Sequence, residues 1–442
     1  MKSNVNKYLD MKKYSKMEKI KILRSGKMQS SVPASAGFFR NRFVQVIMLS
    51  GILLQIGIWV RNFAILLFVM ERTQNDPFAV SMISVAEFAP IFIFSFIGGT
   101  YADRWRPKRT MVWCDLLSAV SVLIVLLTII FGNWQAVFFV TFISSILSQF
   151  SQPSSMKLFK VHVPIEKLQM GMAMFQTLMA IFMIIGPMMG TFVYQRFGIN
   201  IAIGVMGVAF LLSAAVLTFL PADEKEENKQ LQANFWQELS DGFRYVWERK
   251  VLTILGGVFA VAGLAVGIIQ PLGIFIVMER LGLPKESLQW LLATNGAAML
   301  IGGGVLLGLS KKISPQKLLA IGLFVNAITI VGIGISTNWI ITLAFQFLNG
   351  LFMPCIHIGI NTLILQLTEE EFVGRVNGVL NPLFMGAMVI TMSLAGWLKV
   401  QFSLVIMYVV AGVLFFLGTL LTAKLFNTAN SNEKNKLIAD GE

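Results

Sequence analysis

Twelve long apolar runs, separated by short polar turns, fill most of the sequence. An α-helix crosses ~30 Å of hydrocarbon with about 20 residues, and each run is long enough to do so. The pattern therefore predicts an all-α membrane protein with twelve transmembrane helices. The runs cover 43–69, 78–102, 111–131, 134–152, 168–195, 199–220, 251–278, 287–309, 316–336, 339–366, 371–398 and 402–425.

The longest segment between two runs, 221–250, follows the sixth run and divides the chain into two sets of six. Apolar residues recur in it at helical spacing, which predicts an amphipathic helix on the inner membrane surface. They are Phe235, Leu239, Phe243 and Val246. We therefore expect five parts: a basic cytoplasmic tail (1–42), a six-helix bundle (43–220), the linker (221–250), a second six-helix bundle (251–425) and a cytoplasmic tail (426–442).

The two halves repeat some features at corresponding positions. Gly98 and Gly99 precede a basic turn in the first half, and the glycines 302–304 precede Lys311 and Lys312 in the second. Two six-helix halves related by duplication are typical of secondary transporters. The sequence therefore predicts two pseudo-symmetric bundles.

The composition supports a membrane protein, and the distribution of charge gives its orientation. Hydrophobic residues make up 56% of the 442 residues and charged residues only 13%, against about a quarter in soluble domains. The net charge of +13 would fit nucleic acid, but 30 of the 36 Lys and Arg residues fall in the tails, the alternate turns and the adjoining run ends on one side. Because such cations stay in the cytoplasm, we expect cytoplasmic termini, a plasma or inner membrane location and no nucleic-acid partner.

The N-terminal tail leaves three interpretations open. It holds eleven Lys and Arg and two acids, which fits a solvated, disordered tail. It also fits a basic segment that lies on anionic lipid. Translation starting later, for example at Met28, is the third interpretation.

The sequence lacks the motifs of common catalytic sites. It contains no G-x-x-x-x-G-K-S/T segment for ATP. Its two histidines, His162 and His357, show no metal-ligand spacing, and its two cysteines, Cys114 and Cys355, lie inside apolar runs. We therefore expect no enzyme, no cofactor and no metal, and a gradient of protons or of the cargo as the energy source.

Two opposite charges lie at one depth in the first two runs. Arg61 and Glu87 are each about 12–14 Å from the same membrane face at 1.5 Å per residue, and charges within spans are costly and functional by default. We expect them to pair. Either the pair statically locks the two helices together, or Glu87 loads and releases a proton while Arg61 lowers its pKa or changes partner.

Two further titratable residues lie within runs. Asp115, one turn into the third run, is expected in an inner charge network with Arg104, Arg109 or Arg375, with direct proton transfer as the alternative. His357 lies below a proline of the tenth run. It is expected to form a hydrogen bond in helix packing, or to contact the substrate or a proton.

The turn between the second and third runs carries a family resemblance. Residues 98–111 resemble the loop signature G-x-L-A-D-R-x-G-R-K-x-x-L of the major facilitator superfamily, with departures at Tyr101, Arg106 and Pro107. The resemblance implies an inner gate that latches two rocking bundles. The gate residues would be Gly99, Asp103, Arg104, Lys108 and Arg109.

The fifth run carries a second resemblance, to the antiporter motif of drug exporters. Gly186, Pro187 and Gly190 match the core G-P-x-x-G-G, and Thr191 replaces its last glycine. Proline frees a carbonyl and bends a helix, while glycine permits close packing. The match favours export.

Polar residues in runs 1, 4, 7 and 10 are candidates for a substrate cavity, because these helices line the central path in that superfamily. Elsewhere in the runs, amides more often join helices by hydrogen bonds. The cavity candidates are Gln55, Gln149, Gln270, Asn349 and Asn361, together with His357.

Three local features resemble the macrolide-efflux and enterobactin-exporter branch of the drug:proton antiporters. They are Gly57 to Ala64, Phe150 to Pro153, and Gly374 to Val376, although Ser144 stands where that branch often has an arginine. The resemblance implies a monomeric, proton-coupled exporter of hydrophobic or amphipathic small molecules. A dedicated siderophore exporter and a proton-independent facilitator or importer are the alternatives.

Overall fold

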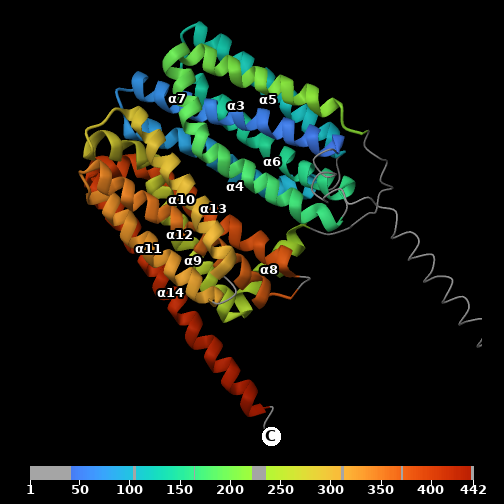
Figure 1. Cartoon of the computed structure of the whole chain (residues 1–442), viewed down its shortest axis with the longest axis vertical. Helices are drawn as coiled ribbons and strands as arrows, with labels where there is room; N and C mark the ends of the chain where they lie inside the picture. Colours follow the sequence, from blue (N-terminus) through green and yellow to red (C-terminus); the bar gives the residue numbers. More distant parts are fainter. Residues whose placement is uncertain are drawn as a thin grey trace, which may run out of the picture. The chain divides into compact units, whose positions relative to one another are not determined.

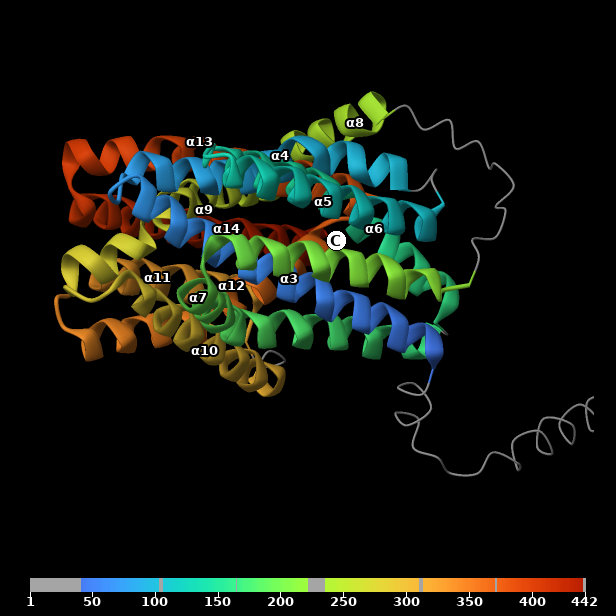
Figure 2. The same ribbon diagram turned by 90° about the horizontal axis from the view of Figure 1, so that it is seen from above.

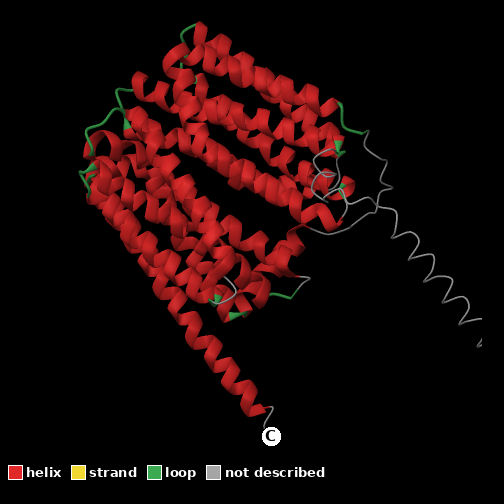
Figure 3. Cartoon of the chain, in the orientation of Figure 1, coloured by secondary structure: helices red, strands yellow, loops and turns green. Residues whose placement is uncertain are grey.

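The structure is a computed structural model that describes residues 41–102, 106–163, 165–221, 235–309, 313–369 and 372–439. All regular structure in these ranges is helical (Figure 3). The basic tail up to residue 40 lies outside the described residues, as do Asp103 and Arg104 of the expected inner gate.

The first half consists of five helical segments. They are α3 (Arg42–Arg72), α4 (Pro77–Ala102), α5 (Pro107–Ile130), α6 (Ala136–His162) and α7 (Ile165–Thr218). The last of these contains two helices, because Gly198 has φ 75° and ψ −177° and breaks the helical backbone. Glycine adopts a positive φ without steric cost, so α7 supplies two membrane spans.

The second half begins with the linker helix α8 (Phe235–Glu248), which lies within the segment 221–250. Six span helices follow, and α9 ends in a π-helical turn (Ile276–Arg280) before a short 3₁₀ turn (Lys285–Ser287). The span helices are α9 (Lys250–Phe275), α10 (Leu288–Leu309), α11 (Pro315–Ile335), α12 (Trp339–Leu367), α13 (Val373–Phe402) and α14 (Leu404–Ala439).

Ten helices in the described residues are long and apolar enough to cross a membrane. One of them, Met174–Thr218, is the stretch that Gly198 divides into two spans. The uncharged α10, with 22 residues, completes the set. The twelve spans predicted from the apolar runs are therefore confirmed.

Proline begins the third span of each half. Pro107 and Pro315 occupy the first helical turn of α5 and α11, directly after the two basic turns. Proline suits this position because its fixed φ is helical and the first N–H groups have no partner within the helix. The departure of Pro107 from the loop signature therefore gives the turn a defined helix start, which the second half repeats.

One face of α5 shows how the apolar surface is used. Trp113, Leu117, Val120 and Leu123 follow one another at helical spacing and are each about half exposed or more. Such a continuous apolar surface would cause aggregation in water, but it matches the hydrocarbon of a bilayer. The buried face of α5 is therefore the opposite one, which carries Asp115.

The two halves pack through α4 on α13 and α7 on α10 (Figures 1 and 2). Glycines of the second half permit the approach. A Cβ at Gly396 would overlap the carbonyl of Pro77, and one at Gly386 would lie 3.1 Å from the ring of Phe92. Gly396 and Pro77 lie near the helix ends on the side of the turn 73–76, which we call the 73–76 end. The opposite end, where α5 begins, is called the Lys108 end.

The linker helix is fastened to the second half by an aromatic stack. The ring of Tyr245 in α8 lies parallel to that of Phe372 with centroids 4.2 Å apart. The guanidinium of Arg249 covers the other face of Tyr245, and that of Arg375 covers Phe372. Arg249 also pairs with Glu369 at 2.6 Å. Cation–π and ion-pair contacts thus hold α8 against the connection between α12 and α13.

Candidate transport site

Arg61 and Glu87 meet inside the first half, and a third residue joins them. Arg61 Nη2 lies 3.7 Å from Glu87 Oε1. Asn62 accepts a 2.8 Å hydrogen bond from Arg61 Nε and donates one of 2.8 Å to the same Glu87 oxygen. The Arg61 side chain is 4% exposed, whereas that of Glu87 is 25% exposed. The structure therefore brings the predicted pair together, with the carboxylate as its accessible member.

Asn62 was missed by sequence reasoning. It follows Arg61 directly within an apolar run, so an amide next to an in-span charge was the available signal. Its side chain has both a donor and an acceptor, which lets it contact the guanidinium and the carboxylate at once. This dual role makes Asn62 the positioning residue of the cluster.

The antiporter-like motif packs against the opposite face of α3. A Cβ at Gly186 would overlap the ring of Trp59, and one at Gly190 would lie 2.7 Å from Cβ of Phe63. Trp59 and Phe63 flank Arg61 on α3 and stack on each other at 6.1 Å. The two glycines therefore let α7 approach α3 closely on the face of α3 that carries Trp59 and Phe63, which lies opposite Arg61. Pro187 lies buried between them within α7.

Asp115 lies in a different environment from the one expected. Its carboxylate is 3% exposed and accepts a 2.6 Å hydrogen bond from Ser213 of α7. The Ser213 hydroxyl also lies 2.8 Å from that of Ser50 on α3. The carboxyl group is therefore surrounded by three helices and hydrogen-bonded to a chain of two hydroxyls.

The expected charge network of Asp115 with Arg104, Arg109 or Arg375 stays a prediction, and the contact that the structure describes for this carboxylate is with Ser213. Arg109 precedes Asp115 by six residues, or about 240° of helical rotation, so the two occupy different faces of α5. Arg375 lies 4.9 Å from the ring of Phe372 in the second half. The sequence did not reveal which face of α5 is buried, and Ser213 gave no signal within its apolar run.

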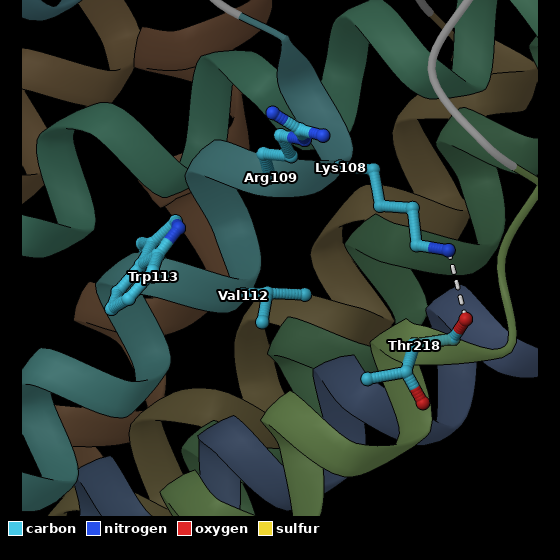
Figure 4. Close-up of a pocket in the computed structure, with 5 residues that line it drawn as sticks. All are labelled: Lys108, Arg109, Val112, Trp113 and Thr218. Carbon is cyan, nitrogen blue, oxygen red and sulfur yellow. Dashed lines mark hydrogen bonds between the residues drawn. The ribbon is translucent and has the colours of Figure 1, made fainter.

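The basic turn is anchored by its lysine. Lys108 Nζ donates to the carbonyl of Thr218 at 2.8 Å and to that of Leu220, at the end of α7. A cation at a helix C-terminus stabilises the carbonyls that have no partner within the helix. Lys108, Arg109, Val112, Trp113 and Thr218 line a pocket of about 420 Å³ there (Figure 4). Gly99 lies in α4. The gate function of Gly99, Lys108 and Arg109 stays a prediction.

The neutral cavity candidates divide into two groups. Gln55 is buried and donates to the sulfur of Met179, and the half-buried Gln149 donates to its neighbour Ser148. Asn349 joins α10, α11 and α12 through an amide network: it accepts from Asn295 at 3.0 Å and donates to Asn326 at 2.7 Å. These three candidates thus make contacts between or within helices.

The second group is exposed in the middle of its spans. It comprises Gln270 of α9 and, one helical turn apart on a single face of α12, His357 and Asn361. Among the described residues, no group of three or more His, Cys, Asp or Glu side chains is arranged to hold a metal ion.

Twelve spans in two halves, with a charged pair between two helices of the first half, define a polytopic membrane transporter. The family model of the Major Facilitator Superfamily matches residues 47–284 and 255–441. The chain therefore belongs to the Major Facilitator Superfamily, and its resemblance to that family is confirmed.

The chain is similar to transporters of the macrolide-efflux branch. It is 25% identical over 329 residues to Macrolide efflux protein A of Streptococcus pyogenes, covering 72% of this chain and 79% of that protein. It is 26% identical over 392 residues to the MFS-type transporter YkuC of Bacillus subtilis, covering 85% and 90%. The multi-drug resistance efflux pump PmrA of Streptococcus pneumoniae is 24% identical over 309 residues, or 67% and 72%.

Solved structures share the fold. A POT family transporter in complex with 5-aminolevulinic acid matches with a TM-score of 0.70 at 14% identity, covering 86% of this chain and 96% of that chain. A D-xylose-proton symporter matches with a TM-score of 0.68 at 15% identity, covering 88% and 98%. At this identity the likeness concerns the arrangement of helices alone.

Proposed function

We propose that this transporter exports hydrophobic or amphipathic small molecules in exchange for protons. The observation that carries the proposal is the cluster in which Asn62 and Arg61 hold the partly exposed Glu87. The similarity to macrolide and multidrug efflux proteins supports export, and so does the close packing of Gly186 and Gly190 against α3.

Glu87 is the group that loads and releases the proton. While ionised, it accepts from Asn62 and pairs with Arg61. A proton on this carboxyl removes the ion pair and leaves Arg61 with Asn62 alone. Breaking a buried ion pair is costly, so protonation favours a different arrangement of α3 and α4. This change is what couples the proton to the movement of the two halves.

The cargo contacts the exposed polar residues of the second half. Charged or polar side chains in a span face a water-filled path in preference to lipid, and the exposure of Gln270, His357 and Asn361 supports a position on that path. Their uncharged donors and acceptors, among many apolar neighbours, suit amphipathic molecules with few charges. We propose that the protein works as a monomer in the plasma membrane, with the 73–76 end outside and both termini in the cytoplasm.

The decisive experiment measures drug-driven proton release from proteoliposomes that hold the purified protein. Glu87→Gln should abolish the release while the protein remains folded. The matched control is Glu369→Gln, which removes an acid that pairs outside the membrane spans. Full coupling in Glu87→Gln would remove Glu87 as the proton carrier. Transport that ignores the proton gradient in the unaltered protein would instead identify a facilitator.

A siderophore exporter of the same fold would give a different result with cells. A strain that lacks the protein would then fail to secrete its siderophore under iron starvation, and its susceptibility to drugs would not change. Under our proposal the strain gains susceptibility to amphipathic drugs, and over-production reverses this. Comparing the two strains on a panel of such compounds also defines the cargo.

A further inference from the structure

Glu71, the last acid of α3, is shared by the two halves. Its Oε2 accepts a 2.6 Å hydrogen bond from the hydroxyl of Tyr194 on α7, within the first half. Its Oε1 accepts a 2.9 Å charged hydrogen bond from Lys285, which lies in the second half between α9 and α10. The lysine side chain is 15% exposed and that of Glu71 53%, so the pair is partly withdrawn from water.

The contacts around this pair close the 73–76 end. Gly396 of α13 lies against the backbone of Pro77 and Phe78 at the start of α4, closely enough that a Cβ would not fit. Alternating access requires this end to open in the other half of the cycle. Opening separates α13 from α4, and it also pulls Lys285 away from Glu71.

Ser81 supplies independent evidence that the closed seam is a temporary one. It is fully buried one turn into α4, and its hydroxyl lacks a hydrogen-bond partner within the described part of the chain. It precedes Phe92, which packs on Gly386 of α13, by eleven residues or about three turns, and so lies on the same face. A buried hydroxyl without a partner is costly, and water reaches it when the halves part.

We propose that Glu71, Tyr194 and Lys285 form a charge latch that holds the 73–76 end shut between transport events. Tyr194 fixes the carboxylate on the first half, and Lys285 brings the second half to it. The latch rests on the proposed transport function, but it concerns the conformational equilibrium alone, so its test follows accessibility and does not measure transport.

A second ion pair at the same end is a matched control. Lys399 of α13 contacts Glu279 of the π-helical turn, and its ammonium also lies 4.2 Å from the ring of Phe275. All three residues belong to the second half. Breaking this pair removes one ion pair of the same type without loosening a contact between the halves.

The test follows the accessibility of a cysteine at Ser81. Ser81→Cys nearly preserves the volume of the side chain. The native Cys114 and Cys355 are buried, so we expect little maleimide labelling of the protein without the substitution. Cells that produce the protein are treated with a membrane-impermeant maleimide, and the labelling rate is measured. Glu71→Gln and Lys285→Gln should each raise the rate about fivefold, the shift expected for a coupling of about 1 kcal/mol. Glu279→Gln should leave it unchanged.

Rescue by charge exchange completes the test. The double variant Glu71→Lys, Lys285→Glu restores the opposite charges and should return the labelling rate towards that of the parent. Tyr194→Phe should give a smaller increase, because it removes the orienting hydroxyl and keeps the ion pair. Equal labelling of the parent and Glu71→Gln would overturn the latch, and so would an equal increase in Glu279→Gln. If the protein showed no drug-driven proton release but the labelling rates changed as expected here, the result would contradict the transport proposal and leave the latch standing.

Discussion

Glu87 is held more closely by Asn62 than by Arg61: the amide nitrogen lies 2.8 Å from Glu87 Oε1, and the guanidinium nitrogen 3.7 Å from the same oxygen. The amide therefore sets the position of the carboxylate, and the cation acts through it as well as directly. A charged pair linked in this way can lose its ionic component on protonation and still retain the Arg61–Asn62 bond.

Asn62→Ala is expected to lower drug-driven proton release about tenfold or more, since a hydrogen bond to a charged group contributes about 1.5–3 kcal/mol. Both Arg61 and Glu87 lose a partner in this variant. The measurement is proton release from proteoliposomes at matched protein content. Asn133→Ala, in the exposed turn after α5, is the control, and an equal loss there would show that the effect is not specific to the cluster.

Gly190→Ala is expected to destabilise the protein by about 1–3 kcal/mol, the usual cost of overpacking. The added Cβ would lie 2.7 Å from both Cβ of Phe63 and the carbonyl of Trp59. Thermal unfolding of the purified protein reports the change. Gly204→Ala is the control on the same segment, because a Cβ there meets open space. Equal unfolding temperatures for the two variants would show that α7 does not depend on Gly190 to approach α3.

Asp115→Ala is expected to cost about 1–3 kcal/mol of stability, because it removes the buried hydrogen bond that the Ser213 hydroxyl donates to the carboxylate. Asp115→Asn keeps an oxygen that can accept the same bond and should unfold near the temperature of the parent. Thermal unfolding distinguishes the two, with the exposed Asp241→Ala as the control. An asparagine variant as unstable as the alanine variant would show that the negative charge itself is required.

The membrane architecture could be predicted from the sequence because apolar length alone determines a span. The pairing of Arg61 with Glu87 could be predicted for a related reason: equal depth on antiparallel neighbours brings two charges together. Both predictions use position along the helix axis, which the sequence gives directly at 1.5 Å per residue.

Rotation about the helix axis could not be predicted in the same way. Asp115 was expected to face the basic residues of its own end, but α5 turns it towards Ser213. An apolar helix in lipid has no polar face to reveal its buried side, because lipid and core accept the same residues. Asn62, Ser213 and the Asn349 network escaped detailed prediction for this reason.

The aromatic stack decides to which half the linker helix α8 is attached. Tyr245 and Arg249 contact Phe372 and Glu369, so the linker helix is attached to the second half even though it precedes the seventh span. If the two halves rock as proposed, a probe attached at the exposed Trp247 would therefore report the motion of the second half.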